Sequence, residues 1–436
     1  MNRIFRFNQK FLIRIPFLIT FITLSIISLL ILQHTNNFNN PVFGFMLSKV
    51  EKQFIWLILG FAIFMILQFL RLRFLNEKIY TMYFATIILL LLPFLGDAIK
   101  GAQNWFMGFQ PSEFGKIIIV IALAKFLSDN KKNINNIYFV FISGFIILIP
   151  TIIFIIQKDI GTALVYFSIF IPMLYWIGLK SRYCFLIFSP IAVGYINMTF
   201  NVYGDPKNPS IYNDSIIPVL VLIVWLIINF IFLFKNSRKI SNMFILIMSL
   251  FFINIFFAIL SDYSWDYMEK YPKSRAGYIK PRIENFIIPT LNPYSGGYQV
   301  AQSKVAVGSG GFFGLGLGEG TQVKFQFIPE SDTDFIISSI AEALGFLFIF
   351  IIILVYLNLF YWLLDYAHKS RNSFLSLLII GYSSMLFFHC IITLGMAVGI
   401  APVTGLPAPF LSYGGTFTLS CFVMLGICNN ISNNNI

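Results

Sequence analysis

The stretch IISSIAEALGFLFIFIIILVYLNLFYWL, which spans residues 336–363, decides the fold of this chain. Its one charged residue is Glu342, and the remainder is almost continuously apolar. An α-helix rises about 1.5 Å per residue, so about 20 apolar residues cross the hydrocarbon core of a bilayer. The stretch therefore predicts a transmembrane helix.

The rest of the chain repeats this pattern. The composition is 58% hydrophobic and 11% charged, with a mean hydropathy of +0.81, whereas a soluble domain carries roughly 25% charged residues. Such a chain cannot cover its own surface with charge in water, so we predict an all-α polytopic membrane protein. Twelve apolar runs are predicted to span the membrane: residues 11–32, 53–70, 79–96, 113–128, 137–156, 160–179, 183–200, 215–234, 241–261, 336–363, 372–396 and 408–429.

The positive charges are distributed unevenly over the connections between these runs. With the N-terminus inside, each inner connection carries at least two Lys or Arg residues, which is the positive-inside pattern. The formal charge of +12 is therefore a topology signal that places both termini in the cytoplasm. We see no basic face outside the membrane, and so we expect no nucleic-acid partner. The first run is too long for a signal-peptide core and lacks a cleavage site, so it is predicted to be a retained helix.

Cysteine and histidine usage does not indicate a metal centre. The three histidines are scattered along the chain, and the cysteines lie within or at the ends of apolar runs, where small packing residues are common. We therefore predict no metal site or disulfide framework built from these residues. They are Cys184, Cys390, Cys421, Cys428, His34, His368 and His389.

One long polar segment, residues 262–335, interrupts the apolar pattern with Pro, Gly and charge. Nine preceding spans place it outside, and long loops retained in compact proteins are usually functional. The chain is accordingly predicted to divide into residues 1–261 with nine spans, the extracytoplasmic loop 262–335, and residues 336–436 with three spans and a short cytoplasmic tail. Within the loop, the spacing around Tyr298 predicts a short amphipathic helix along the membrane surface.

Three further polar clusters interrupt apolar territory, at residues 101–116, 157–162 and 405–415, and the predicted topology places all three on the outer side. Their convergence on one face predicts a single site. Lys116 lies within an apolar run, where an unpaired charge costs about 3 kcal/mol, so it either forms a structural ion pair or faces a phosphate-bearing ligand. Trp105 is either an interfacial aromatic or a residue that stacks on a sugar.

Asp334 directly precedes the 336–363 span. Carboxylates at this place are ordinary helix N-caps, and a catalytic role is the alternative; Asp332 and Glu330 are equally well placed. The nearby glycine run 308–320 contains fragments of a phosphate-binding loop but lacks the strand and helix that such a loop needs. The glycine run predicts a tightly turning, closely packed segment in which glycine residues adopt positive φ.

Taken together, these segments resemble the SEDS (shape, elongation, division, sporulation) family, in the family's order and over nearly the whole chain. Residues 302–311 and 320–322 resemble the elongation type more than the division type. The matching segments are Gly101-Ala-Gln-Asn-Trp105, Gln110-Pro-Ser-Glu-Phe-Gly-Lys116, Asp159-Ile-Gly-Thr162, residues 298–311, Gly320-Thr-Gln322, Pro329-Glu-Ser-Asp-Thr-Asp-Phe-Ile336 and Pro409-Phe-Leu-Ser-Tyr-Gly-Gly-Thr416.

The resemblance implies a SEDS-type bundle of ten core helices, to which residues 215–261 add an inserted pair. It also implies a peptidoglycan glycosyltransferase of the bacterial cytoplasmic membrane. Such an enzyme polymerises lipid II into nascent glycan, releases polyprenyl diphosphate, and works with a class B penicillin-binding protein and elongation-complex membrane proteins during rod-shaped growth. A divalent cation, Mg²⁺ or Mn²⁺, is an expected cofactor.

The resemblance further assigns roles to individual residues. Asp334 matches the family's catalytic aspartate. The residues expected to bind substrate or support the site are Trp105, Glu113, Lys116, Asp159, Gln302, Ser303, Lys304, Gln322, Glu330 and Ser412.

The chain departs from the family pattern at three places. Asp332 stands where the family usually has His, Ala343 replaces a usual second acid, and Asn292-Pro293 replaces Asp-Pro. Asp332 beside Asp334 leaves open which carboxylate is the base, because neighbouring like charges raise one pKa. The alternative functions are a division-type polymerase, a lipid-linked precursor flippase and a non-enzymatic scaffold. A flippase needs polar residues across the whole membrane, whereas these clusters stop at the outer face.

Overall fold

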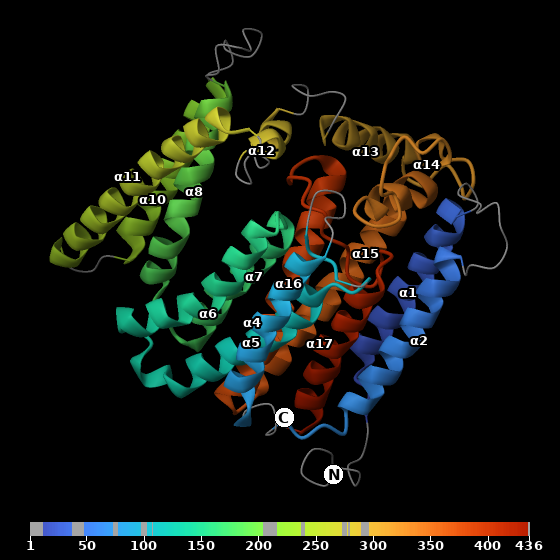
Figure 1. The fold of residues 1–436 in the computed structure, drawn as a ribbon, viewed down its shortest axis with the longest axis horizontal. Helices are drawn as coiled ribbons and strands as arrows, with labels where there is room; N and C mark the ends of the chain where they lie inside the picture. The colour runs from blue at the N-terminus through green and yellow to red at the C-terminus, as the bar shows by residue number, and fades with distance from the viewer. Residues whose placement is uncertain are drawn as a thin grey trace. The chain divides into compact units, whose positions relative to one another are not determined.

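Every regular element in the described residues of the computed structural model is a helix, apart from an isolated bridge between Phe106 and Phe109. The chain forms two compact units (Figure 1): a larger one from residues 1–178 and 298–436, and a smaller one from residues 179–297. The structure describes residues 12–36, 48–72, 77–96, 103–106, 108–203, 216–236, 240–272, 277, 280–288 and 296–434.

The larger unit is a bundle of long helices whose N-terminal and C-terminal members pack against each other. Its first half contains α1 (Ile15–Asn36), α2 (Lys49–Leu67), α4 (Ile79–Leu91), η1 (Leu92–Leu95), α5 (Pro111–Asp129), η2 (Lys131–Asn133), α6 (Ile137–Ile156) and α7 (Ile160–Ile177). Its second half contains α13 (Gly296–Gly310), α14 (Thr321–Lys324), α15 (Ile336–Lys369), α16 (Ser373–Val398) and α17 (Gly415–Asn434), with α13 belonging to it from Tyr298 onward.

The smaller unit consists of α8 (Ser181–Tyr203), α10 (Ile216–Asn236), α11 (Ile240–Lys270) and α12 (Lys280–Ile287). The predicted inserted pair corresponds to α10 and most of α11, which pack on α8. A core cluster of Val202, Trp265, Met268 and Ile288 joins α8 and α11 to the end of α12.

Nine helices in the described part of the chain are long and apolar enough to cross a membrane. Two others, α4 with η1 and part of α10, are shorter apolar helices. The remaining predicted span corresponds to α5, which contains charged residues at both ends. The all-α polytopic class is confirmed, and the number of twelve crossings stays a prediction.

Some segments of the predicted organisation lie outside the described residues. These are residues 1–11 before the first span, Gly101 and Ala102 of the first polar cluster, and residues 273–276, 278–279 and 289–295 of the extracytoplasmic loop. The division into residues 1–261, 262–335 and 336–436 also stays a prediction.

The burial pattern is the reverse of that in a soluble protein. Large apolar side chains face outward, as Phe84 does with 67% of its surface exposed. Polar side chains such as Gln53 and Asn429 are fully buried and hydrogen-bonded between helices. In lipid the exposed apolar face costs nothing, and packing and internal hydrogen bonds hold the helices together.

Small residues allow α2 and α17 to approach closely. A methyl group on Gly60 of α2 would collide with the Phe422 ring, and one on Gly415 of α17 would collide with Trp56. Close approach at small residues is the usual way in which helices associate in membranes. This contact fixes the start of α17 and the loop that precedes it.

The glycine run 308–320, called the glycine segment below, supplies hydrogen-bond partners at a break in α15. Gly345 adopts φ 78° and ψ −177°, which interrupts the helix and frees backbone groups. The amides of Leu315 and Gly316 donate to the carbonyls of Glu342 and Ala343 at 2.9 and 3.0 Å. In return, the amides of Phe346 and Leu347 donate to carbonyls of residues 311 and 312. Because lipid offers no hydrogen bonds, this exchange makes the break tolerable.

A helix is present around Tyr298, and its amphipathic character along the membrane surface stays a prediction. The expected helix corresponds to α13, which lies with α14 at the upper end of the bundle in Figure 1. The Glu342 carboxylate accepts hydrogen bonds from the amides of Gln322 and Val323 at 2.8 and 3.1 Å, which fixes α14 to α15. Gln322, expected to contact substrate, is therefore buried against Glu342.

Gly314 tests this account of the glycine segment. Its φ is +82°, and a methyl group there would collide with the Ala343 carbonyl, so Gly314→Val should destabilise the fold by about 2 kcal/mol or more. Gly308→Ala is the matched control, because no atom lies within 4 Å of the added methyl group. Thermal unfolding in detergent should show a lower midpoint for Gly314→Val alone. Equal midpoints for both variants would contradict the proposed packing.

Candidate active site

Asp334 lies in a short irregular segment between the glycine segment and α15. The segment is held by its own backbone, because the Phe335 amide donates to the Glu330 carbonyl at 3.2 Å. Thr333 Oγ1 donates to Glu330 Oε2 at 3.1 Å, which gives Glu330 a local structural contact. The N-cap of α15 is Phe335, which forms no side-chain cap. Asp334 is therefore not the N-cap residue of α15, and its side chain is partly buried.

The loop between α16 and α17, residues 399–414, is bonded to this segment. Ser412 Oγ donates to the Thr333 carbonyl at 2.6 Å and accepts from the Ala408 amide at 2.8 Å. The Tyr413 amide donates to the Asp332 carbonyl at 2.9 Å. Ser412 is thus a positioning residue that fixes the backbone on the N-terminal side of Asp334.

Gly405 brings the same loop next to the Asp334 carboxylate. Its φ is +72°, a conformation that favours glycine, and a methyl group there would lie 3.5 Å from Asp334 Oδ2. The carboxylate oxygen consequently faces bare backbone. A larger residue at this position would be strained and would narrow the space beside Asp334.

Asp332 forms an ion pair with a residue from the N-terminal part of the chain. Lys49, at the start of α2, forms an ion pair with Asp332, whose side chain is 8% exposed against 42% for the lysine. Burial raises the pKa of the neighbouring Tyr413 phenol, while Lys49 lowers it and Asp332 raises it. The phenol therefore stays protonated at neutral pH.

Helix α13 packs beside the segment of Asp334 through its buried face. Ser303 Oγ donates to the Ala397 carbonyl at 2.7 Å and lies 2.6 Å from Ser338 Oγ. Ala306 packs in a cluster with Ile328 and Phe335. These contacts make α13, the start of α15 and the end of α16 one body.

The neighbours of Ser303 on α13 are less enclosed. Gln302 is partly buried, whereas Lys304 is exposed. The Lys304 stem lies over Gly399, where a methyl group would come within 2.7 Å of Nζ. This places the Lys304 ammonium group at the start of the same 399–414 loop.

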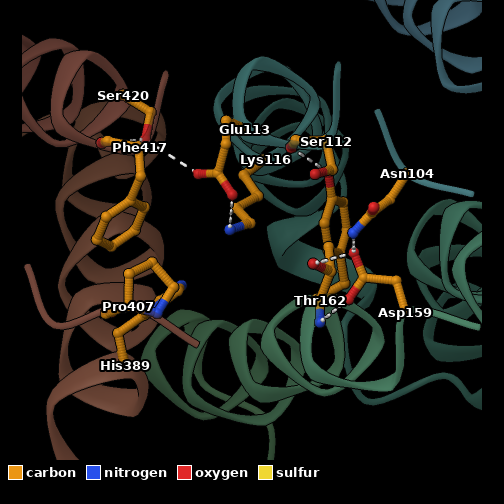
Figure 2. Close-up of polar contacts among 11 residues, drawn as sticks. Asn104, Ser112, Glu113, Lys116, Asp159, Thr162, His389, Pro407, Phe417 and Ser420 are labelled. Carbon is orange, nitrogen blue, oxygen red and sulfur yellow. Dashed lines mark hydrogen bonds and ion pairs between the residues drawn. The ribbon is translucent and has the colours of Figure 1, made fainter. Parts of the chain in front are cut away.

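A second cluster surrounds Lys116 on α5. Lys116 Nζ lies 2.7 Å from Glu113 Oε1, and the two side chains are 1% and 3% exposed. Ser420 Oγ donates to Glu113 Oε2 at 3.3 Å, and the ammonium group lies 5.6 Å from the centre of the Phe417 ring (Figure 2). Of the two interpretations of Lys116, the ion pair is the one present. Its charge is matched within the helix bundle.

His389 connects this second cluster to the 399–414 loop. Its ring lies 4.8 Å from that of Phe417, and Nδ1 forms a 3.0 Å hydrogen bond with the Pro407 carbonyl. Figure 2 shows His389 and Phe417 on one side of the Glu113–Lys116 pair and Asp159 on the other. The pair is therefore flanked by residues from both halves of the larger unit.

Asp159 caps α7 and holds the segment before α5. It accepts hydrogen bonds from the amide and hydroxyl of Thr162 at 3.0 and 2.9 Å, and from Asn104 Nδ2 at 2.7 Å. Trp105 follows Asn104 and is partly buried. A methyl group on Gly161 would collide with the Thr404 carbonyl, so the N-terminus of α7 packs on the same 399–414 loop.

The structure thus joins the two clusters through one loop. The segment of Asp334 and the N-terminus of α7 both contact residues 399–414, which include most of the third polar cluster, and Asn104 of the first cluster bonds to Asp159 of the second. The single site that the sequence predicts stays a prediction. The catalytic and substrate-binding roles assigned to individual residues stay predictions.

Sequence reasoning missed several residues of this arrangement. The sequence gives no signal that Lys49 pairs with Asp332, and it marks Gly405 only as part of the polar cluster 405–415. His389 was read as a scattered histidine in an apolar run, with no signal of its bond to Pro407. These partners are far apart in sequence, so local patterns do not reveal them.

The described residues contain no group of three or more His, Cys, Asp or Glu side chains placed to hold a metal ion. A Mg²⁺ site usually needs only one or two protein carboxylates when substrate phosphates supply further ligands. The expected divalent cation stays a prediction.

The fold and the site define a polytopic helical membrane protein. Its bundle contains a buried ion pair, and the loop 399–414 holds the segment of a carboxylate, Asp334, at one end. A family model described as cell cycle protein, covering FtsW, RodA and SpoVE, matches residues 9–206 and 216–436. The chain therefore belongs to the SEDS family.

Relatives in this family have similar lengths. The chain is 27% identical over 403 residues to the peptidoglycan glycosyltransferase RodA of Treponema pallidum, covering 87% of this chain and 89% of that one. It is 28% identical over 390 residues to the peptidoglycan glycosyltransferase MrdB of Helicobacter pylori, covering 87% and 82%. A probable peptidoglycan glycosyltransferase FtsW of Trichlorobacter lovleyi is 29% identical over 351 residues, covering 79% and 72%.

Solved structures share the fold. A chain from a structure titled "Structural coordination of polymerization and crosslinking by a peptidoglycan synthase complex" matches with a TM-score of 0.59 and 21% identity, covering 95% of this chain and 96% of that one. The rod shape determining protein RodA of Thermus thermophilus matches with a TM-score of 0.57 and 20% identity, covering 96% of both chains.

The buried ion pair on α5 gives a stability test with an internal control. Lys116→Met leaves the buried Glu113 carboxylate unmatched and should cost about 3–5 kcal/mol. Adding Glu113→Gln should recover part of that loss. Lys125→Met breaks the more exposed Lys125–Asp129 pair on the same helix and should cost about 1 kcal/mol or less. Thermal unfolding of the purified variants distinguishes these outcomes, and similar midpoints for Lys116→Met and Lys125→Met would refute the assignment.

Proposed function

We propose that this chain is a peptidoglycan glycosyltransferase that polymerises lipid II into glycan strands during cell-wall elongation. Its family, and relatives that bear the name peptidoglycan glycosyltransferase, support this activity. The observation that carries the proposal is the position of Asp334, whose Oδ2 faces the bare backbone of Gly405 in a segment held by Ser412. The elongation role rests on the resemblance of residues 302–311 and 320–322 to that type.

The proposed reaction is an inverting glycosyl transfer. Asp334 takes the proton from the 4-hydroxyl of the acceptor GlcNAc, and the oxygen attacks the anomeric carbon of the donor MurNAc. The bond between that carbon and the diphosphate oxygen breaks, and its electron pair leaves with the polyprenyl diphosphate. Base catalysis of this kind contributes about 10²–10⁴-fold, and holding the two lipids in line contributes much of the rest.

Two carboxylates compete for the role of base, and the resemblance to the family, which matches Asp334 to its catalytic aspartate, favours Asp334. Asp332 is ion-paired with Lys49 and nearly buried, and its backbone carbonyl holds Tyr413. The ion pair with Lys49 therefore gives Asp332 a structural contact within the protein. We therefore propose Asp334 as the catalytic residue and Asp332 as a positioning residue.

The departing diphosphate needs a cation that is not already matched. Lys116 is buried and paired with Glu113, so its charge is largely used within the protein. Lys304 is exposed above Gly399 at the start of the loop beside Asp334. We propose that Lys304 stabilises the leaving group. A divalent cation, if used, would draw most of its ligands from the diphosphate, and no step above depends on it.

The proposed setting is the bacterial cytoplasmic membrane, with both termini in the cytoplasm and Asp334 outside. The positive-inside distribution of Lys and Arg supports this orientation. We propose a class B penicillin-binding protein and elongation-complex membrane proteins as partners. The likeness to a chain from a peptidoglycan synthase complex that coordinates polymerization and crosslinking supports the first of these.

The test is polymerisation of lipid II by purified protein with its transpeptidase. Asp334→Asn should lower the rate by about 10²-fold or more, because the amide does not accept the proton. Asp332→Asn removes the ion pair to Lys49 but leaves the proposed base, and should retain roughly a tenth or more of the rate. Both variants should unfold at temperatures close to wild type.

Three results would overturn the assignment. Normal chain formation by Asp334→Asn would remove this residue from catalysis, and inactivity of folded Asp332→Asn alone would transfer the role to Asp332. Transport of lipid II across vesicle membranes by wild-type protein without any polymerisation would instead indicate a flippase.

A further inference from the structure

An open pocket lies at the end of the larger unit that is opposite Asp334 along α15. Its volume is about 320 Å³, and it is formed where α7 and α15 end, α16 begins and η2 follows α5. The lining residues are Lys131, Trp176, Ile177, Ala367, His368, Ser370, Arg371, Ser373 and Ser376. Neither the proposed reaction nor the resemblance to the family uses these residues.

The charge of the pocket is entirely basic. Lys131, His368 and Arg371 line it, and none of its lining residues is acidic. The nearby carboxylate of Asp365 is paired with Lys369 at 2.7 Å, and that of Asp129 is paired with Lys125. Two permanent positive charges and an imidazole therefore face a space in which no lining carboxylate balances them. A group of opposite charge would lower the energy of this arrangement.

The remaining lining groups favour a phosphate. Lys131 Nζ already contacts the Ser373 hydroxyl at 3.1 Å, so a cation and a hydroxyl group lie together at the start of α16. The positive end of the α16 dipole points to the same place. Trp176 Nε1 donates to Ser376 Oγ at 2.7 Å, which fixes the indole in the wall. Ile177 and Ala367 add an apolar surface beside these polar groups.

The location indicates where such a phosphate comes from. The pocket lies at the ends of apolar helices that span the membrane, and Tyr175, next to Trp176, is 61% exposed. Aromatic residues at helix ends are typical of the level of lipid headgroups. Basic pockets between transmembrane helices on the cytoplasmic side bind anionic headgroups. We propose that this pocket binds the phosphate of an anionic phospholipid of the inner leaflet.

The site would couple lipid composition to the opposite end of the bundle. The helices that meet at the pocket carry Glu113, Asp159 and Asp334 at or next to their other ends, and α16 leads there into the loop 399–414. A phosphate that bridges Lys131 and Arg371 would tie the end of α5 to the turn between α15 and α16. This proposal concerns lipid binding and does not depend on glycosyl transfer.

The experiment uses full-length protein in nanodiscs of phosphatidylcholine, with and without phosphatidylglycerol. Wild-type protein should retain phosphatidylglycerol in native mass spectra and unfold at a higher temperature when that lipid is present. The Lys131→Gln/Arg371→Gln variant should bind it about 20-fold more weakly, since each cation near an anionic surface contributes a factor of about five. It should also lose the thermal shift.

Two matched variants guard against general charge effects. Lys369→Gln removes a cation one residue before the pocket residue Ser370, but Lys369 is paired with Asp365 and does not line the pocket, so binding should be unchanged. The swap Lys131→Arg/Arg371→Lys keeps the charge and should keep binding. Equal losses for Lys369→Gln and the double variant, or no loss for the double variant, would overturn the proposal.

Inorganic phosphate distinguishes the two sources of the anion. Added to protein in phosphatidylcholine alone, it should give no thermal shift if the pocket takes a lipid. A shift of the size produced by phosphatidylglycerol, lost in the double variant, would show a site for a soluble phosphate and would overturn the lipid assignment.

Discussion

The hydrogen bonds between the loop 399–414 and the segment before α15 hold the candidate site together. Ser412 bridges the Ala408 amide and the Thr333 carbonyl, and the Tyr413 amide meets the Asp332 carbonyl. These contacts fix the backbone of an irregular segment, and the Asp334 carboxylate lies beside Gly405. A general base contributes to catalysis only when it is held within reach of one proton. The geometry of the proposed reaction depends on this loop.

The same loop is also in contact with residues that surround the buried charges. His389 bonds to the Pro407 carbonyl and packs on Phe417, which lies over the Lys116 ammonium group. The N-terminus of α7 packs on the loop at Gly161, directly after its cap, Asp159. Charged groups inside the bilayer are expensive and are kept where they are paired. Here the paired charges contact the loop through His389 and Phe417, and the N-terminus of α7 contacts it at Thr404.

Lipid as solvent explains why polar groups concentrate inside this bundle. A broken helix in lipid must have its freed backbone groups satisfied by protein, and the glycine segment does this for α15 at Gly345. That exchange also places Glu342 where it fixes the start of α14. The break, the glycine segment and α13 therefore form one structural body at the N-terminal end of α15. At the other end of α15, the basic pocket provides a second contact between the bundle and its surroundings.

The sequence alone determined the class of this protein and the locations of its unusual residues. Helix length and hydropathy depend on neighbouring residues, so the apolar runs and the positive φ angles in the glycine run were predictable. The cost of an isolated charge in lipid left two interpretations of Lys116, an ion pair or a contact with a phosphate-bearing ligand. Tertiary structure decided which groups meet. The Lys49–Asp332 ion pair joins residues 283 positions apart, and the Ser412 bond to Thr333 spans 79. Such contacts depend on how whole helices pack, and local periodicity does not encode that. For this reason the sequence left Asp332 and Asp334 equivalent, whereas the fold pairs Asp332 with Lys49 and places Asp334 next to Gly405.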